Sequence, residues 1–129
     1  MSIDYGQSAI TAFNAAAGAG SINFDPAAVK EAVGLYTQMI NGLTTTRQRL
    51  EEAVKAQGFG GFQSGQELQS GFISKAREGI DVINQLIEGA MRLQEAYLRA
   101  GNLLEDADQK NAAALRFAAQ AAESDSLPT

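Results

Sequence analysis

The side chains that could do chemistry here are carboxylates, lysine, arginine, tyrosine, serine and threonine, because the sequence contains neither histidine nor cysteine. Cys/His zinc sites, Ser-His-Asp triads and Cys-His nucleophile pairs are therefore excluded. The paired carboxylates are Glu78 with Asp81, three residues apart, and Glu88 with Glu95, seven apart on one helical face. Acid–base catalysis by such pairs needs a cleft, which the helical hairpin predicted by this sequence does not provide. We therefore expect no enzyme activity and no catalytic residue.

Arginines follow two of these carboxylates at helical spacing. Arg92 comes four residues after Glu88, and Arg99 comes four residues after Glu95. Such pairs stabilise a helix modestly, and the pattern is typical of the solvated face of a long helix. The Glu-Asp-Ala-Asp run at 105–108 lacks the spacing of a calcium loop and predicts a hydrated surface. The sequence thus predicts neither a metal site nor a cofactor.

Length and charge restrict the possible partners. The 129 residues suffice for one domain, and the formal net charge of −5 disfavours binding to nucleic acid. No stretch approaches the roughly 18 apolar residues of a membrane span, and neither expected helix has the basic, aromatic-rich pattern of a membrane-surface helix. Residues 1–5 lack the positive and apolar regions of a secretory signal peptide. We therefore expect neither a cleavable signal peptide nor membrane binding.

The first element that the sequence predicts with clear signals is a helix over residues 25–57. Asp25 can accept hydrogen bonds from first-turn amides, and Pro26 stands where its missing N–H costs nothing. The apolar positions then alternate in steps of four and three, interrupted only by Arg47. This seam consists of Val29, Val33, Tyr36, Ile40, Leu43, Leu50 and Val54.

A glycine-rich turn over residues 58–63 is expected to separate this helix from a second one over 64–122. Ser64 and Glu67 have the spacing of a capping box at the start of the second helix. Residues 1–24 predict a flexible or partly helical arm, with a short helix near 8–16 whose Ile10 and Phe13 dock on the rest of the chain. Residues 123–129 predict a disordered tail. The turn motif consists of Phe59, Gly60, Gly61 and Phe62, with both aromatic rings expected to pack at the end of the hairpin.

The second helix carries more apolar surface than one partner helix can cover. One seam runs from Phe72 to Ala107, and a second apolar stripe lies beside it. Two packed helices share only a narrow line of contact, so the second stripe predicts a dimer that forms a four-helix bundle. Glycines at 71, 79 and 89 predict close backbone approach in this helix. The expected dimer interface consists of Ile73, Ile80, Ile87, Met91 and Leu98.

The order of these features resembles the Trp-x-Gly (WXG) superfamily of small helical-hairpin proteins exported by type VII (ESX) systems of actinobacteria. The resemblance rests on the Asp25-Pro26 helix start, the aromatic/glycine turn and the long helix that begins Ser64-Gly65-Gln66-Glu67-Leu68, and it covers residues 24–108. Phe59-x-Gly61 replaces the Trp-x-Gly turn. The export signal of the family, Tyr-x-x-x-Asp/Glu, is imperfect here, because Tyr97 is followed by Gly101 and the nearest acidic residue is Glu105.

The resemblance implies a non-enzymatic type VII secretion-associated protein. It would be a secreted substrate, or a dimerising partner that delivers a substrate or toxin. The implied partners are a second copy or another helical-hairpin protein, together with the type VII secretion ATPase. The implied location is cytoplasmic before export, then secreted or at the cell surface. A cytosolic helical adaptor or chaperone unrelated to secretion is the alternative, and the overhang beyond Tyr97 is expected to be mobile until it meets the secretion machinery.

Overall fold

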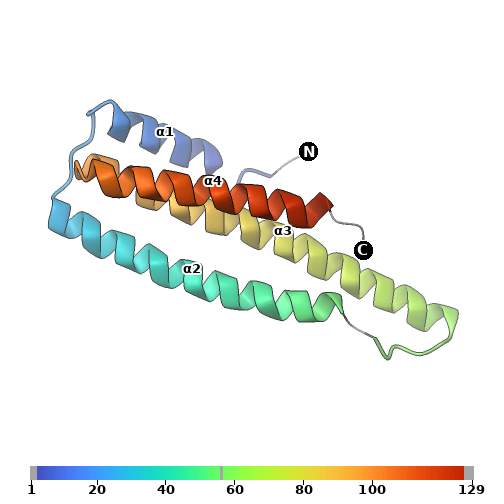
Figure 1. Cartoon of the computed structure of the whole chain (residues 1–129). Helices are drawn as coiled ribbons and strands as arrows, with labels where there is room; N and C mark the ends of the chain where they lie inside the picture. Colours follow the sequence, from blue (N-terminus) through green and yellow to red (C-terminus); the bar gives the residue numbers. More distant parts are fainter. Residues whose placement is uncertain (1–2, 56, 127–129) are drawn as a thin grey trace.

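The computed structural model describes residues 3–55 and 57–126, and every regular element in these ranges is an α-helix. The elements are α1 (Gln7–Gly18), α2 (Pro26–Val54), α3 (Gln63–Ala100) and α4 (Leu104–Ser126) (Figure 1). The all-α prediction is confirmed, but the second predicted helix is divided into α3 and α4. The expected disordered tail is helical as far as Ser126, and residues 127–129 lie outside the described part. None of the described helices is both long and apolar enough to cross a membrane.

The start of α2 follows the sequence signals. The Asp25 carboxylate accepts a hydrogen bond from the backbone N–H of Ala28 at 3.1 Å, and Pro26 occupies the first turn. The helix ends at Val54 rather than at the predicted residue 57. In the loop that follows, Gly58 and Gly60 have φ angles of 90° and 96°, a backbone region that favours glycine.

The start of α3 differs from the prediction. Phe62 is the N-cap residue and makes no side-chain capping bond, so Ser64 already lies inside the first turn. Glu67 supports this turn by accepting a hydrogen bond from the Gln63 side chain at 3.1 Å, instead of closing a capping box. The predicted capping box at Ser64 is therefore wrong.

The chain reverses after α3, where the sequence predicted a continuous helix. Asn102 adopts a left-handed conformation, with φ 59°. The N–H of Leu103 bonds to the carbonyl of Leu98 at 2.8 Å, and the N–H of Asn102 bonds to that of Arg99 at 3.0 Å. This pair of bonds is the Schellman arrangement that ends helices, and Leu103 also packs against the Leu98 cluster. The overhang expected beyond Tyr97 is consequently an ordered helix, α4, packed back on α3.

The helix α3 lies at the centre of the molecule. α1, α2 and α4 each pack against it, and no other two helices in the described ranges have their backbones in close contact. α2 and α4 run antiparallel to α3, whereas α1 runs parallel to it (Figure 1). The loop end of the α2–α3 pair extends beyond α1 and α4. The packed bundle therefore surrounds only the half of α3 that ends at Ala100.

The N-terminal arm contains the short helix that its sequence predicts. Ile10 of α1 lies against Gly89 of α3, where an added Cβ would come within 3.4 Å of the Ile10 Cδ1 atom. Gly79 similarly admits Leu50, whose Cδ1 atom would lie 3.0 Å from an added Cβ. Close approach is thus confirmed at Gly79 and Gly89, whereas Gly71 has no such neighbour and its prediction is wrong.

The second apolar stripe of α3 is covered within the chain. Ile87 and Leu98 are only 1% and 3% exposed, while Ile73, Ile80 and Met91 are half-buried. The prediction that these five residues form a dimer interface is wrong for the two buried ones. The reason is the reversal after α3, because α4 packs back on α3 and Leu98 is buried in a cluster with Val29 of α2 and Ala107 of α4. Val29, Leu98 and Ala107 form the buried cluster at the end of the bundle.

Candidate functional site

The centre of the bundle contains a buried carboxylate held by two arginines. Glu95 of α3 is 4% exposed. Its Oε1 atom lies 3.0 Å from Nη1 of Arg92, and its Oε2 atom accepts hydrogen bonds from Nη2 and Nε of Arg99 at 2.7 and 3.0 Å. A buried carboxylate requires such compensation for its lost hydration. The predicted pair Glu95–Arg99 is confirmed, but Glu95 is buried rather than on a solvated face. Arg92, which was predicted to pair with Glu88, also pairs with Glu95.

This polar cluster joins three helices. Asn14 of α1 hydrogen-bonds to the Glu95 side chain. Arg92 also donates to Oδ1 of Asn111 on α4 at 2.5 Å, and Arg99 lies 3.5 Å from Asp108 on α4. Burial acts to raise the pKa of Glu95, but the hydrogen bonds from Arg99, Arg92 and Asn14 outweigh it and hold the pKa below its ordinary value. The cluster therefore keeps a charged carboxylate inside the bundle.

A second buried polar side chain fixes α2 to α3. Gln94 is 1% exposed, and its Nε2 atom donates to the Val33 carbonyl and to Oγ1 of Thr37, both at 2.9 Å. Because hydrogen bonds need specific partners, a polar group at a helix interface favours one register over others. We infer that Gln94 sets the register of α2 against α3.

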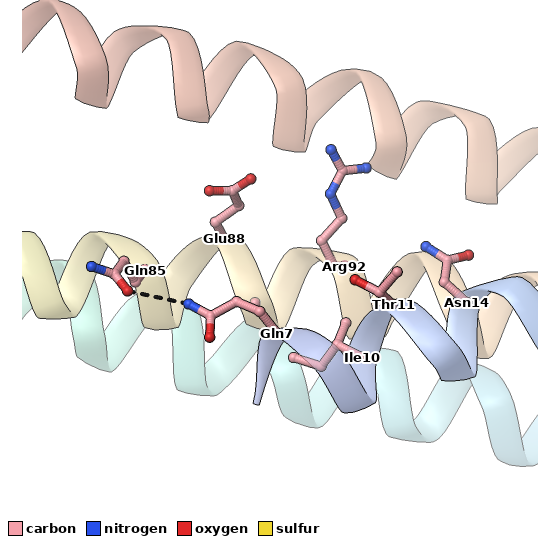
Figure 2. A pocket seen from close by; sticks show the side chains of 8 residues that line it. Gln7, Ile10, Thr11, Asn14, Gln85, Glu88 and Arg92 are labelled. Carbon is pink, nitrogen blue, oxygen red and sulfur yellow. Dashed lines mark hydrogen bonds between the residues drawn. The ribbon is translucent and has the colours of Figure 1, made fainter. Parts of the chain in front are cut away.

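A groove of about 340 Å³ lies between α1 and α3, beside the Glu95 cluster. Figure 2 shows Glu88 and Arg92 projecting from α3 toward α4, with Gln7, Thr11 and Asn14 on the α1 side. The groove is spanned at one end by a hydrogen bond from Nε2 of Gln7 to Oε1 of Gln85, 3.2 Å long. The lining residues are Gln7, Ile10, Thr11, Asn14, Gln85, Glu88, Gly89 and Arg92.

The groove presents amide and hydroxyl groups rather than a catalytic pair. Of the two carboxylates predicted on one face, Glu88 lines the groove, whereas Glu95 is bonded to two arginines. The other spaced pair, Glu78 and Asp81, lies on the part of α3 that approaches the loop end, where Glu78 pairs with Lys75 at 3.2 Å. The structure therefore does not bring the predicted carboxylates together for acid–base work.

The run at 105–108 forms the start of α4. Glu105 and Asp106 lie in the first turn, where negative charge stabilises a helix N-terminus. Ala107 is fully buried, and Asp108 faces Arg99. No group of three or more metal-ligating side chains occurs among the described residues. The acidic residues thus have a structural explanation in the helix start.

The turn motif is only partly packed. The Phe59 ring lies 5.8 Å from the Phe72 ring, measured between centroids. Phe62 is 85% exposed, so the prediction that both rings pack at this end is wrong for Phe62. The reason is that Phe62 is the N-cap residue of α3 and therefore precedes its first turn. The remaining motif residues, Gly60 and Gly61, lie in the same loop and have no neighbour within 4 Å of an added Cβ.

Replacing the two aromatic residues separately should give unequal results. Phe59→Ala removes the ring contact with Phe72 and is expected to lower the free energy of unfolding by about 1–2 kcal/mol. Phe62→Ala should change it by less than about 0.5 kcal/mol, because the ring is already in solvent. Urea titration followed by circular dichroism measures both. Equal losses would contradict the packing described for this loop.

The region expected to carry an export signal is divided by the chain reversal. Tyr97 belongs to an aromatic cluster, with its ring 5.0 Å from Phe13 and 5.8 Å from both Phe24 and Tyr36. Gly101 is buried, and an added Cβ there would lie 3.0 Å from Cγ2 of Val29. Glu105 is exposed on α4. Of the three residues, only Glu105 is thus freely presented to a partner.

The burial of two polar residues of this centre, Gln94 and Glu95, was missed in the sequence, although one of them left a signal. Gln94 continues the seven-residue series Ile73, Ile80, Ile87, and a polar residue in such a series indicates a buried hydrogen bond. Glu95 gave no signal, because its spacing to Arg99 is the same for a solvated pair and for a buried one. The sequence matches no family model, and no curated protein or solved structure proved similar to it.

Proposed function

We propose that this chain is a non-enzymatic type VII (ESX) secretion-associated protein, a secreted substrate or a dimerising partner that delivers a substrate or toxin. The observation that carries the proposal is the antiparallel α2–α3 pair joined by the Phe59–Phe62 loop, which fits the helix-turn-helix order of the WXG superfamily. The Asp25-Pro26 start of α2 is also part of that resemblance. The saturated hydrogen bonding of Glu95 supports a structural rather than a catalytic role.

The proposed partners are a second copy of the chain or another helical-hairpin protein, forming a four-helix bundle, and the type VII secretion ATPase. The protein would be cytoplasmic before export, then secreted or at the cell surface. Because Tyr97 is packed among aromatic rings, we assign recognition by the secretion machinery to the exposed start of α4 at Glu105. A partner protein with a complete Tyr-x-x-x-Asp/Glu export signal would supply the part of the signal that this chain lacks.

The experiment compares export in two actinobacterial strains, one with a functional type VII ATPase and one without it. Tagged protein is expected in the culture filtrate or at the surface of the first strain only, with a cytoplasmic marker showing that cells are intact. Glu105→Gln should reduce export severalfold, whereas Glu31→Gln, exposed at the start of α2, should leave it unchanged. Export that is equal in both strains would contradict the proposal.

The alternative function is a cytosolic helical adaptor or chaperone. It is favoured by the groove beside α1, whose mixed lining includes amide and hydroxyl groups that a bound segment can contact. The same experiment separates the two functions. Retention of the protein in the cytoplasm of both strains, with the fold intact by circular dichroism, would support the adaptor and exclude the secreted protein.

A further inference from the structure

Two side chains of opposite charge stand in the groove beside α1 without pairing with each other. Glu88 and Arg92 are four residues apart, a spacing at which such side chains form ion pairs on a helix. Arg92 pairs with Glu95 instead, and Glu88 has no ion pair or hydrogen bond within residues 3–55 and 57–126. Figure 2 shows both side chains projecting from the same face of α3. The groove therefore offers a ligand one negative and one positive group.

Arg92 keeps hydrogen-bond donors for such a ligand. Its bonds to Glu95 at 3.0 Å and to Asn111 at 2.5 Å both use the Nη1 atom. The Nε and Nη2 atoms donate to nothing in the part of the chain that the structure describes, and the side chain is 26% exposed. These two atoms form one edge of the planar guanidinium, and such an edge binds a carboxylate through two parallel hydrogen bonds. Arg92 can thus bind a carboxylate while it holds Glu95.

Glu88 lacks the compensation that Glu95 receives. Its side chain is half-buried, so the carboxylate has lost part of its hydration without gaining a charged partner. An ammonium group that entered the groove would supply that partner. Thr11 and Gln85 line the same groove with side-chain oxygen atoms, which accept further hydrogen bonds from an ammonium. Glu88 is therefore suited to bind a primary amine.

A second hollow, of about 330 Å³, continues the groove along α3 between α3 and α4. The two hollows adjoin, because Gln85 and Glu88 line both of them. Asp81 also lines the second hollow, seven residues or roughly 10 Å from Glu88 along the helix. From Arg92 through Glu88 to Asp81, the charges along α3 are thus positive, negative and negative. The wall of α4 consists of Phe117, Ala118, Ala121 and Ala122.

We propose that this groove binds a free basic α-amino acid, of the arginine and lysine class. The α-carboxylate bonds to the free edge of Arg92, the α-ammonium bonds to Glu88, and the cationic side chain extends along the second hollow toward Asp81. An α-amino acid carries its two α-groups on one carbon atom, so they fit two side chains from successive turns of one helix. Hollows of about 340 and 330 Å³ are within the size range of small-molecule sites.

The charge of the chain favours the same class of ligand. A net charge of −5 attracts cations to the surface, and a basic amino acid is the class of amino acid with a net positive charge. An acidic amino acid would place its side-chain carboxylate near Asp81, and like charges in contact suppress binding. This site goes beyond the proposed secretion role and does not depend on it.

Isothermal titration calorimetry of the purified chain with L-arginine tests the site. The wild type should bind L-arginine, and L-glutamate at least about tenfold more weakly. Glu88→Gln should weaken the binding of L-arginine about tenfold or more, because it removes the charge that pairs with the α-ammonium. Glu31→Gln, exposed on α2, is the matched control and should bind like the wild type. A wild type that does not bind L-arginine, or a Glu88→Gln variant that binds it equally well, would overturn the proposal.

Analogues of arginine test both anchors on the unchanged protein, so this result does not depend on the folding of a variant. Agmatine lacks the α-carboxylate that Arg92 binds, and Nα-acetyl-L-arginine lacks the α-ammonium that Glu88 binds. Each should bind at least about tenfold more weakly than L-arginine. Nα-acetyl-L-arginine amide has both groups blocked, like a residue within a peptide. If it bound as tightly as L-arginine, the groove would hold a chain segment and the amino-acid site would be overturned.

Discussion

Ile87→Asp is expected to unfold the protein, with a loss of at least about 5 kcal/mol in the free energy of unfolding. Ile87 is 1% exposed within the chain, so the substitution removes a fully packed side chain and buries an unpaired charge in its place. A loss of that size is comparable to the whole stability of a small domain. Circular dichroism should show lost helix, and light scattering should show aggregated or expanded protein.

The matched control is Ile80→Asp, one heptad earlier. Ile80 is half-buried, and its substituted carboxylate can reach water, so the expected loss is about 1–2 kcal/mol with the helices retained. If Ile87 were instead a dimer contact, both substitutions would leave a folded, helical monomer. A soluble, cooperatively folded Ile87→Asp variant would therefore contradict the buried position of this residue.

Glu95→Ala is expected to lower the free energy of unfolding by about 3 kcal/mol. The substitution leaves Arg92 and Arg99 without their shared carboxylate and removes the hydrogen bond from Asn14. Breaking a buried pair by removing one partner costs about 3–5 kcal/mol, and the lower value applies because the arginine side chains are 26% and 22% exposed. Glu88→Ala on the same helix should cost less than about 1 kcal/mol.

The stability of the wild type should also fall in acid because of Glu95. Its pKa is lowered in the folded state, so the unfolded chain binds a proton more readily than the folded one. The contribution is therefore fully present above the ordinary pKa of 4.5 and is lost as pH falls through the lower folded value. Glu95→Gln should flatten the pH dependence of unfolding below about pH 4.5. The free energy of unfolding is measured by urea titration at several pH values. If its dependence on pH were the same in the variant and the wild type, the lowered pKa would be contradicted.

The sequence predicted those elements whose signals are local. Asp25 and Pro26 define the start of α2 by hydrogen bonding and ring geometry within a few residues, whereas its end at Val54 comes before the glycines that predicted it. The helix within residues 1–24 was also predictable from local pattern, including the docking of Ile10 and Phe13. None of these required knowledge of what lies beside the helix in space.

The reversal at Asn102 was missed because its signal is weak in sequence. Asparagine tolerates the left-handed conformation, but it also occurs within helices, and the apolar series continues past it through Leu104 and Ala107. Tertiary packing decides that the chain reverses here, because Leu103 packs against Leu98 and Ala107 belongs to the same cluster. The interface predicted at Ile87 and Leu98 was wrong for this single reason.

The candidate site was less predictable than the fold. The spacing of Glu95 and Arg99 indicates a helical pair in any environment, and burial depends on α1 and α4 covering that flank of α3. Asn14 and Asn111, which complete the cluster from those two helices, stand 81 and 16 residues from Glu95 in the sequence. Contacts at such separation leave no local pattern.

The central position of α3 has a consequence for how the native state opens. Because the backbones of α1 and α4 approach only α3, each can be released without displacing the backbone of the other. α1 buries only Ala17 fully, whereas α3 buries nine residues, so their amide protons should exchange with solvent on very different timescales. The molecule is thus a persistent α2–α3 scaffold to which α1 and α4 are attached as separate opening units, and the side chains around Glu95 couple the opening of one to that of the other.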